Sequence, residues 1–308
     1  MPPARHALAT ALRRVAATAP VLALVAGCLS REPAWPTFTV VDTMEAGASQ
    51  LAIGTAFLAG VDGAGHAWLA ERPDGVASAS IRPLTLPARL GAPPGLAVAP
   101  DGSLLISDPG HHRVWRVSPG QPAITTVFAG SGTDFQPIGD RARAVGAQLS
   151  RPAALATLGG DTWLADPGFR RVRRIDAEGR IDTVLGSGLK GAWPDQPTPL
   201  RLPLPEPGAL AVAPDARLAV ADGRHGVVVS GPGDRIARWP ETGISGLAWL
   251  GDGTLVAARG LAIIGWRGGG TKVLLDGVEP ITALCGDGGE SLWCATAART
   301  VRLRVNQP

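Results

Sequence analysis

Residues 107–120 have the sequence SDPGHHRVWRVSPG, and residues 165–179 have the similar sequence ADPGFRRVRRIDAEG. A phrase that returns within one chain indicates a supersecondary unit that is copied along the sequence. Each copy follows a Gly/Asp turn and a short apolar run, as in APDGSLLISD, and leads into an alternating run such as HRVWRVS. Each unit therefore predicts two strands around a tight turn, followed by a third and a fourth strand.

Six copies of this unit can be aligned on the residue that closes the apolar run. The closing residues lie 37, 58, 56, 37 and 37 positions apart, at Glu71, Asp108, Asp166, Asp222, Arg259 and Thr296. Four antiparallel strands repeated about every 40 residues are typical of a propeller blade. The sequence thus predicts an all-β, six-bladed β-propeller with four-stranded antiparallel blades, which begin near residues 55, 94, 152, 207, 244 and 280.

The phrases DPGHHRV and DPGFRRV, each followed by GSG, resemble NHL repeats over most of residues 55–305. Blades two and three match best, whereas blades one, five and six lack the Asp-Pro-Gly phrase. In that family architecture, the turns between second and third strands share one face with the linkers between blades. The two long intervals hold insertions at 130–152 and 186–207, which we expect to form a raised wall on this face beside the channel mouth.

The sixth unit supplies ITALCG, SLWCATA and TVRLRV but lacks a fourth strand. Residues 37–43, TFTVVDT, alternate and are rich in β-branched side chains. We expect this N-terminal strand to pair with TVRLRV and close the ring, because closure removes an open sheet edge. The propeller domain would then span residues 37–308.

Two cysteines flank the turn GDGGESLW of the sixth unit. Cys285 and Cys294 lie in adjacent predicted strands, as cross-strand neighbours. A metal site needs more ligands than two thiols, and none lies nearby in the sequence. In an oxidising compartment this placement favours a disulfide between the two residues.

Residues 1–27 have the features of a secretion signal, with a basic start and an apolar run over 15–26 that is too short to span a bilayer. The run ends in VAGC, residues 25–28, which resembles the lipobox of bacterial lipoproteins. The resemblance implies lipidation of Cys28, a tether over 28–36 and, with Leu29 next, an outer-membrane lipoprotein on the periplasmic or outer surface. An ordinary secretory signal and an organellar transit peptide remain as alternatives.

The basic isoelectric point of about 9.1 comes from this first segment. The chain has 29 Lys and Arg against 26 Asp and Glu, and residues 1–27 hold Arg5, Arg13 and Arg14 without an acid. The remainder is neutral and lacks the basic stripe that phosphate binding needs. We therefore expect no nucleic-acid partner, a membrane contact through the lipid alone, and a monomer.

The candidate binding residues lie in the loops of the predicted face, where propeller and other scaffold proteins place their sites. His111, His112, Phe169, Arg170 and His225 are in turns, and Arg151, Glu206 and Glu279 directly precede innermost strands. Asp108 and Asp166 recur with the repeat, which favours a structural role as acceptors of backbone hydrogen bonds in the turns. We expect the five turn residues and three linker residues named above to contact the ligand, and the two aspartates to support the turns.

Two functions fit this face. The favoured one is a non-catalytic module that binds a protein or glycan, because no Ser-His-Asp or Cys-His constellation is recognisable and no catalytic residue can be named. The alternative is a metal-dependent hydrolase or lyase of the lactonase kind, in which Glu206 and Glu279 would hold a divalent ion as the one cofactor. Fold alone does not choose between them, because propellers host both.

Replacing Cys28 by serine is expected to move the protein from the membrane to the soluble fraction. Several acyl chains at about 0.8 kcal/mol per buried methylene give stable attachment, and the variant would carry none. Fractionation followed by immunoblotting measures the shift, and Cys285→Ser is the control that should stay membrane-bound. A Cys28→Ser protein that remains in the membrane fraction contradicts the lipid anchor.

Overall fold

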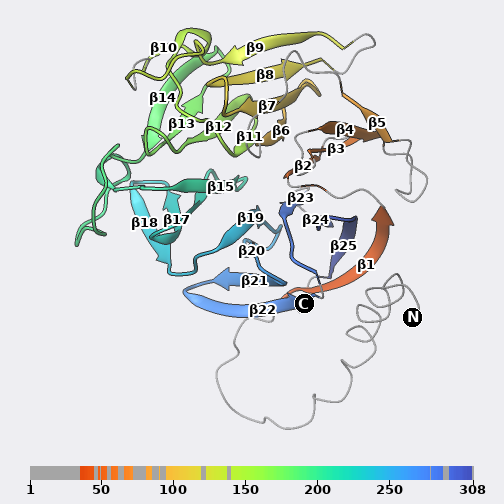
Figure 1. The fold of residues 1–308 in the computed structure, drawn as a ribbon. Helices are drawn as coiled ribbons and strands as arrows, with labels where there is room; N and C mark the ends of the chain where they lie inside the picture. Colours follow the sequence, from red (N-terminus) through yellow and green to blue (C-terminus); the bar gives the residue numbers. More distant parts are fainter. Residues whose placement is uncertain are drawn as a thin grey trace.

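The computed structural model describes residues 35–44, 48, 50–53, 57–61, 66–71, 81–84, 90, 95–118, 123–136, 140–277, 279–286 and 291–306. These residues form six antiparallel sheets arranged around a central axis (Figure 1). The prediction of a six-bladed β-propeller is confirmed. No helix within the described ranges is long and apolar enough to cross a bilayer. Cys28 and the expected signal lie outside these ranges.

The strands follow each other from the channel outward in each blade. Blade one holds β2 (Gln50–Ile53), β3 (Phe57–Val61), β4 (Ala67–Glu71) and β5 (Ile81–Pro83). Blade two holds β6 (Leu96–Val98), β7 (Leu104–Asp108), β8 (Arg113–Val117) and β9 (Thr125–Ala129). Blade three holds β11 (Leu155–Leu158), β12 (Asp161–Asp166), β13 (Arg171–Ile175), β14 (Arg180–Leu185) and an added edge strand, β10 (Ala142–Arg143).

The other three blades repeat this order. Blade four holds β15 (Pro207–Val212), β16 (Leu218–Asp222), β17 (Gly226–Gly231) and β18 (Arg235–Trp239). Blade five holds β19 (Ile244–Trp249), β20 (Leu255–Arg259), β21 (Ala262–Arg267) and β22 (Gly270–Asp276). Blade six holds β23 (Ala283–Gly286), β24 (Ser291–Ala295), β25 (Thr300–Asn306) and β1 (Thr37–Met44).

The N-terminal strand closes the ring as predicted. β1 pairs antiparallel with β25, from Thr37 opposite Asn306 to Met44 opposite Thr300. Figure 1 shows the red and blue ends of the chain side by side in blade six. Phe38 of β1 packs against the hydrophobic cluster formed by blades five and six. Closure therefore joins the first and last strands by both a backbone ladder and side-chain packing.

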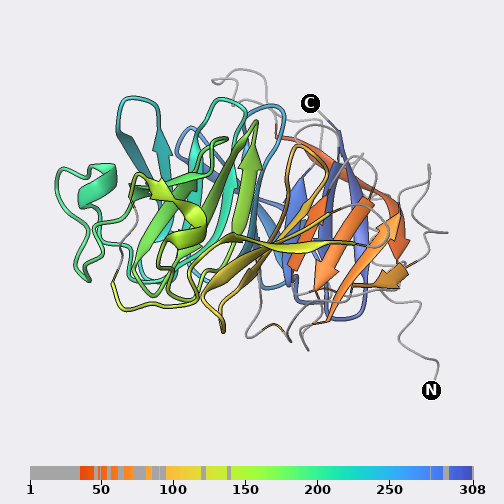
Figure 2. The ribbon, with the colours of Figure 1, turned by 90° about the horizontal axis from the view of Figure 1, so that it is seen from above.

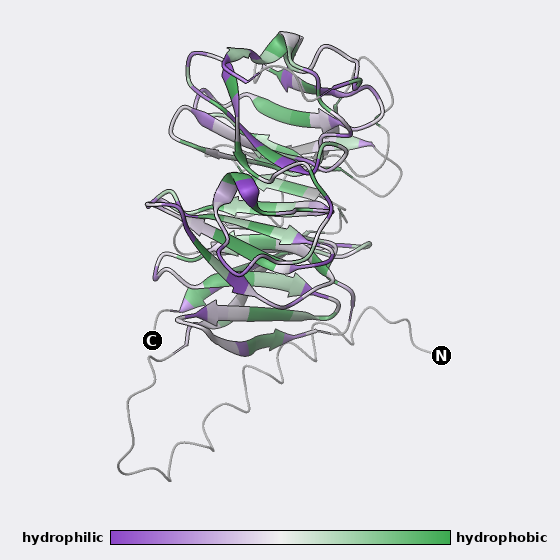
Figure 3. Ribbon diagram, turned by 90° about the vertical axis from the view of Figure 1, so that its left-hand side faces the viewer, coloured by the Kyte–Doolittle hydropathy of each residue, from purple (hydrophilic) through white to green (hydrophobic). Residues whose placement is uncertain are grey.

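The core consists of six buried clusters, most of which join neighbouring blades. Strand residues alternate between the two faces of a sheet, so each blade presents apolar side chains to both neighbours. Trp239 of blade four stacks on Trp266 of blade five with ring centroids 6.3 Å apart. Figure 3 shows hydrophobic residues along the strands and hydrophilic residues concentrated at their ends. Polar side chains that could contact a ligand are therefore found mainly in the turns and linkers.

Blade one is out of register with the expected alignment. Glu71, which aligned with Asp108, closes the third strand, because β4 pairs with β3 on one side and β5 on the other. Asp108 instead closes a second strand. The second strand of blade one thus ends at Val61, and its third strand begins at Ala67. Glycine-rich turns occur at both ends of a blade, so the 37-residue interval from Glu71 was not a true repeat interval.

The predicted disulfide is wrong for this structure, in which Cys285 and Cys294 are both thiols. Cys285 lies opposite Trp293, and Cys294 lies opposite Leu284. Because successive side chains of a strand point to opposite faces, this register places the two sulfurs on opposite faces of blade six. Cys294 belongs to the core, and burial raises the pKa of its thiol to about 12.

Deleting residues 37–44 is expected to lower the thermal midpoint by about 10 °C, since a full strand ladder and the packing of Phe38 are lost and several kcal/mol shift a domain of this size by that order. Differential scanning calorimetry measures the midpoint. Thr39→Ala is the control, because Thr39 is exposed and its removal costs only the hydrogen bond from Asn306 Nδ2. A deletion variant that melts like the intact chain would show that β1 does not close the ring.

Candidate functional site

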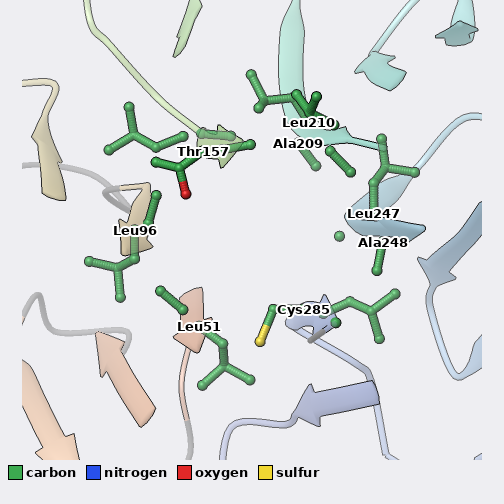
Figure 4. A pocket seen from close by; sticks show the side chains of 18 of the residues that line it. Leu51, Leu96, Thr157, Ala209, Leu210, Leu247, Ala248 and Cys285 are labelled. Carbon is green, nitrogen blue, oxygen red and sulfur yellow. The ribbon is translucent and has the colours of Figure 1, made fainter. Parts of the chain in front are cut away.

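The six innermost strands surround a central channel of about 520 Å³. Figure 4 shows its wall, with Leu51, Leu96, Thr157, Ala209 and Leu247 around the opening. Among the residues that the structure describes, none that lines this channel is charged and none is a histidine. This described part of the wall therefore offers no carboxylate or imidazole for acid–base chemistry or for holding a metal.

The two hydroxyl groups of the wall are occupied by backbone carbonyls. Thr157 Oγ1 donates to the carbonyl of Val98 at 2.7 Å. Ser245 Oγ donates to the carbonyl of Ile281, also at 2.7 Å. Neither hydroxyl is placed as a nucleophile, because no base contacts it in the described part of the chain.

Turns and linkers meet on one face of the ring, which we name the linker face. It comprises the turns at 108–113, 166–171, 222–226, 259–262 and 295–300 and the linker residues 150–154, 206 and 279–282. Gly168 N donates to the carbonyl of Ser150 at 2.9 Å, and Gly223 N donates to that of Glu206 at 3.1 Å. The linker of each of these blades is thus bonded to the turn of the same blade.

The repeat aspartates secure these contacts. Asp166 Oδ1 accepts the backbone N–H of Ser150 at 2.8 Å, and Asp222 Oδ2 accepts that of Glu206 at 2.8 Å. Asp222 Oδ1 also accepts the N–H of His225 within its own turn. These carboxylates are almost fully buried. They serve as acceptors for backbone donors that would otherwise be buried without a partner.

Four of the expected site residues come together between blades two and three. Arg151 N donates to His112 Nδ1 at 3.3 Å, which joins the linker of blade three to the turn of blade two. Phe169 and Arg170 follow Gly168, which is bonded to the residue before Arg151. Arg170 Nη1 also donates to the carbonyl of Gly188 at 3.3 Å. His112, Arg151, Phe169 and Arg170 therefore form one continuous patch.

Three members of this patch have a left-handed backbone. His112, Arg151 and Arg170 have φ values of 55°, 57° and 54°. The position of blade four equivalent to His112 and Arg170 is Gly226, with φ 82°. A residue with a side chain costs about 1–2 kcal/mol in this conformation, whereas glycine costs almost nothing. Blades two and three thus retain polar side chains where glycine would be more stable, as binding surfaces often do.

His111 is also in the blade-two turn but has a local role. Its side chain is half exposed, and Nδ1 lies 2.7 Å from Asp108 Oδ2. Trp115 Nε1 donates to the same carboxylate oxygen at 3.0 Å. His111 is therefore a solvated turn residue that shares an acceptor with the third strand.

Asp134 of the first insertion was not predicted as a site residue, because no repeat pattern marks it. Ser150 Oγ donates to Asp134 Oδ2 at 3.1 Å, and His112 Nε2 lies 3.8 Å from the same oxygen. A serine, a histidine and an aspartate thus meet, but the aspartate lies between the other two. Because a catalytic triad needs the histidine in contact with the serine, this arrangement is no nucleophilic site.

The two expected site residues of blade four, Glu206 and His225, differ in exposure. Glu206 is exposed, and its carboxylate lies so close to Gly223 that a Cβ there would come within 2.5 Å of Oε2. His225, expected on the surface, is instead only 5 % exposed. Its ring packs edge-on against Trp193 of the second insertion at 5.9 Å. The prediction for His225 is corrected, because the insertion covers its turn.

Glu206 and Glu279, the metal ligands of the alternative function, belong to the linkers of different blades. Glu279 lies beside the blade-six turn, where Arg299 Nη2 donates to its Oε1 at 3.4 Å. Blade five stands between this residue and Glu206. Within the described ranges, no three His, Cys, Asp or Glu side chains are grouped as metal ligands would be. The donors present do not fit a divalent ion held by these two glutamates.

The expected wall at the channel mouth is also corrected. β10 of the first insertion pairs with β14, the outer strand of blade three. The short 3₁₀ helices η3 (Ala144–Gly146) and η4 (Pro199–Arg201) pack against the outer strands β9 and β14. Figures 1 and 2 show both insertions on the outside of the ring. Only their ends return across the linker face.

A fully buried arginine anchors the first insertion. Arg173 Nη2 donates to Asp140 Oδ1 at 2.7 Å, and Arg173 Nη1 lies 3.8 Å from Asp166 Oδ2. Burial raises the pKa of Asp166 from 3.8 to about 7, although the Ser150 N–H and the charge of Arg173 act in the opposite direction. The pKa of this carboxyl, which lies in the turn that carries Phe169 and Arg170, is therefore near neutral pH.

This raised pKa predicts a pH dependence of stability. The folded chain holds the Asp166 proton more tightly than the unfolded chain, so the contribution of this group is full below about pH 4 and is lost as pH rises to about 7. Asp166→Asn cannot titrate and should flatten the fall in thermal midpoint between pH 4 and 7. Asp215→Asn, at an exposed aspartate of blade four, should keep the wild-type slope. Parallel slopes in all three proteins would contradict the assignment.

Comparison with known proteins gives the fold and no family. The sequence matches no protein-family profile and no curated protein. A candidate gluconolactonase of known structure has a TM-score of 0.61 at 16% identity, over 89% of this chain and 93% of that one. Virginiamycin B lyase from Staphylococcus aureus, determined with quinupristin, has a TM-score of 0.55 at 14% identity, over 88% and 99%.

A chain from the nidogen/laminin complex is similar as well, with a TM-score of 0.56 at 17% identity over 79% of this chain and 86% of that one. These structures include enzymes and a protein–protein complex on related propellers. At such low identity the similarity extends to architecture, and function must be argued from the residues of this chain.

Proposed function

We propose that this protein is a non-catalytic propeller of the NHL type that binds a partner protein beside blade three. The observation that carries the proposal is the distribution of exposed apolar side chains. Seven large hydrophobic residues are exposed in the described part of the chain, and four belong to the two insertions. We name these four the insertion surface: Phe135, Val145, Leu189 and Leu200.

Exposed apolar residues are normal when scattered, but a concentration of them marks an interaction site. The two insertions flank the outer edge of blade three, one before it and one after it. The patch of His112, Arg151, Phe169 and Arg170 lies between their ends on the linker face. Apolar residues with an aromatic and an arginine beside them have the composition of protein interfaces. Aliphatic side chains suit a protein better than a glycan.

The catalytic alternative has less support from this site. The described residues of the channel wall include no acid or base, and Glu206 and Glu279 precede blades four and six, on either side of blade five. The metal-dependent hydrolase or lyase therefore stays the second candidate, with no geometric observation in its favour. The lipid on Cys28 is part of the proposal too, and would place the binding surface at the outer membrane of a bacterium.

A photo-crosslinking amino acid at position 135 or 189 is expected to capture one and the same partner protein in the cells that produce the chain, identified by mass spectrometry. The matched control is position 273, where Val273 is similarly exposed on β22 of blade five. Phe169→Ala combined with Arg170→Ala should reduce the crosslink from position 189 at least about fivefold, which corresponds to about 1 kcal/mol.

Crosslinks that are equal at all three positions, or absent from 135 and 189, would overturn the binding proposal. Metal analysis of the purified protein addresses the alternative directly. One divalent ion per chain that disappears in both Glu206→Gln and Glu279→Gln would favour the enzyme instead.

A further inference from the structure

We infer that the central channel is a second binding site, which takes one small, uncharged and mainly apolar molecule. This inference is independent of the partner surface, because it concerns the innermost strands and not the insertions. The channel volume of about 520 Å³ lies within the range of about 300–1,000 Å³ typical of small-molecule sites.

Most of the described wall side chains are apolar and either small or branched. The partly exposed ones include Ile53, Val98, Ala156, Ala209 and Val212, one or more from each of four blades. They present carbon to the opening from several sides of the ring. When an apolar molecule replaces water beside these side chains, no hydrogen bond to them is lost and apolar surface is removed from water, which is favourable.

The channel also has hydrogen-bonding groups of one kind. β2, β6, β11, β15, β19 and β23 are each the terminal strand of their sheet, paired on one side only. Because these strands line the channel, the peptide groups of their inner edges are turned to it. Uncharged amide, hydroxyl or carbonyl groups of a ligand could pair with these peptide groups, and the apolar side chains would cover its carbon skeleton.

A ligand with a charged group does not fit the described channel wall. A carboxylate, phosphate or ammonium group in the channel would lose hydration without meeting an opposite charge from the described wall residues. Burial of an ion without a partner is strongly unfavourable. The described wall residues supply apolar side chains and peptide groups but no charged group. They therefore favour a ligand with an apolar carbon skeleton and uncharged hydrogen-bonding groups.

Cys285 provides a reporter inside the channel. It is half-buried and lines the wall, whereas Cys294 is buried in the core. Because burial raises the pKa of the Cys294 thiol to about 12, that residue should not react in the folded protein. An uncharged thiol reagent such as N-ethylmaleimide should modify Cys285 alone, and an occupied channel should slow this reaction.

The test uses the uncharged fluorophore N-phenyl-1-naphthylamine and its charged relative 1-anilinonaphthalene-8-sulfonate, which share an aromatic body. All proteins are the full chain with Cys28→Ser, so that neither a lipid nor a third thiol contributes. We expect saturable binding of the uncharged probe at one site per chain, at least about tenfold weaker binding of the sulfonate, and at least tenfold slower modification of Cys285 at saturating probe, measured on the peptide that contains it.

Ala209→Phe fills the channel from β15 and should weaken binding of the uncharged probe at least tenfold. Ala237→Phe adds the same side chain on the exposed outer strand of blade four and should change nothing. Equal probe binding in both variants, or binding without protection of Cys285, places the probe elsewhere, such as on the insertion surface, and overturns the inference. If Ala209→Phe does not fold, protection of Cys285 in the parent protein decides alone, and unchanged modification there rejects the channel site.

Discussion

A buried carboxylate at the end of the second strand is the contact on which the linker face depends. In blades three and four it accepts the backbone N–H of the preceding linker, at Ser150 and Glu206. A buried acceptor of this kind must be paired, and its removal would leave a linker donor unsatisfied as well. The bond therefore determines where each linker enters its innermost strand. It also determines where the next side chain, such as Arg151, meets the neighbouring turn.

Blades five and six keep this linkage with other chemistry. Arg259 stands where the aspartates stand in blades two to four, and its Nη1 lies 2.8 Å from Oε2 of Glu241 in the preceding linker. An ion pair between two side chains here takes the place of the bond from a backbone N–H to a carboxylate, and turn and linker are still joined. In blade six, Arg299 of the turn contacts Glu279 of the linker. The Asp-Pro-Gly phrase is absent from these blades, but a side-chain contact still holds the linker against the turn.

This distinction explains how much of the structure the sequence could predict. Six blades and closure by β1 follow from period, alternation and the missing strand, which are properties of whole segments. The pairing of Cys285 depends on a shift of a single residue. The alignment of blade one was wrong by a whole strand, because Gly/Asp turns look alike at both ends of a blade. Residues that belong to the repeat, such as His112 and Arg170, lie in the turns where the repeat places them, and their role in binding stays a prediction. The prediction failed where an insertion decides burial, as with His225 under Trp193.

Each of the two insertions is closed by two backbone hydrogen bonds, which we call its base, and the insertions differ in the chain between these bonds. Gly130 N and Ser131 N donate to the carbonyls of Ala144 and Ala147, and Gly186 N and Ser187 N donate to those of Pro199 and Leu202, all at 2.8–2.9 Å. The glycines are required, because a Cβ at Gly130 would come within 2.3 Å of the His112 carbonyl and one at Gly186 within 2.5 Å of the Arg170 carbonyl.

Each base is therefore fixed on a turn that carries a candidate binding residue, while the chain between the bonded ends is left to vary. Of the four exposed apolar residues, Phe135 and Leu189 lie in these intervening parts, whereas Val145 and Leu200 lie in the bases. A rigid scaffold with a fixed loop base and a variable tip is the arrangement by which folded domains acquire new partners without losing stability. In this chain, the repeat bond that holds the linker also fixes the position of the surface proposed to bind the partner.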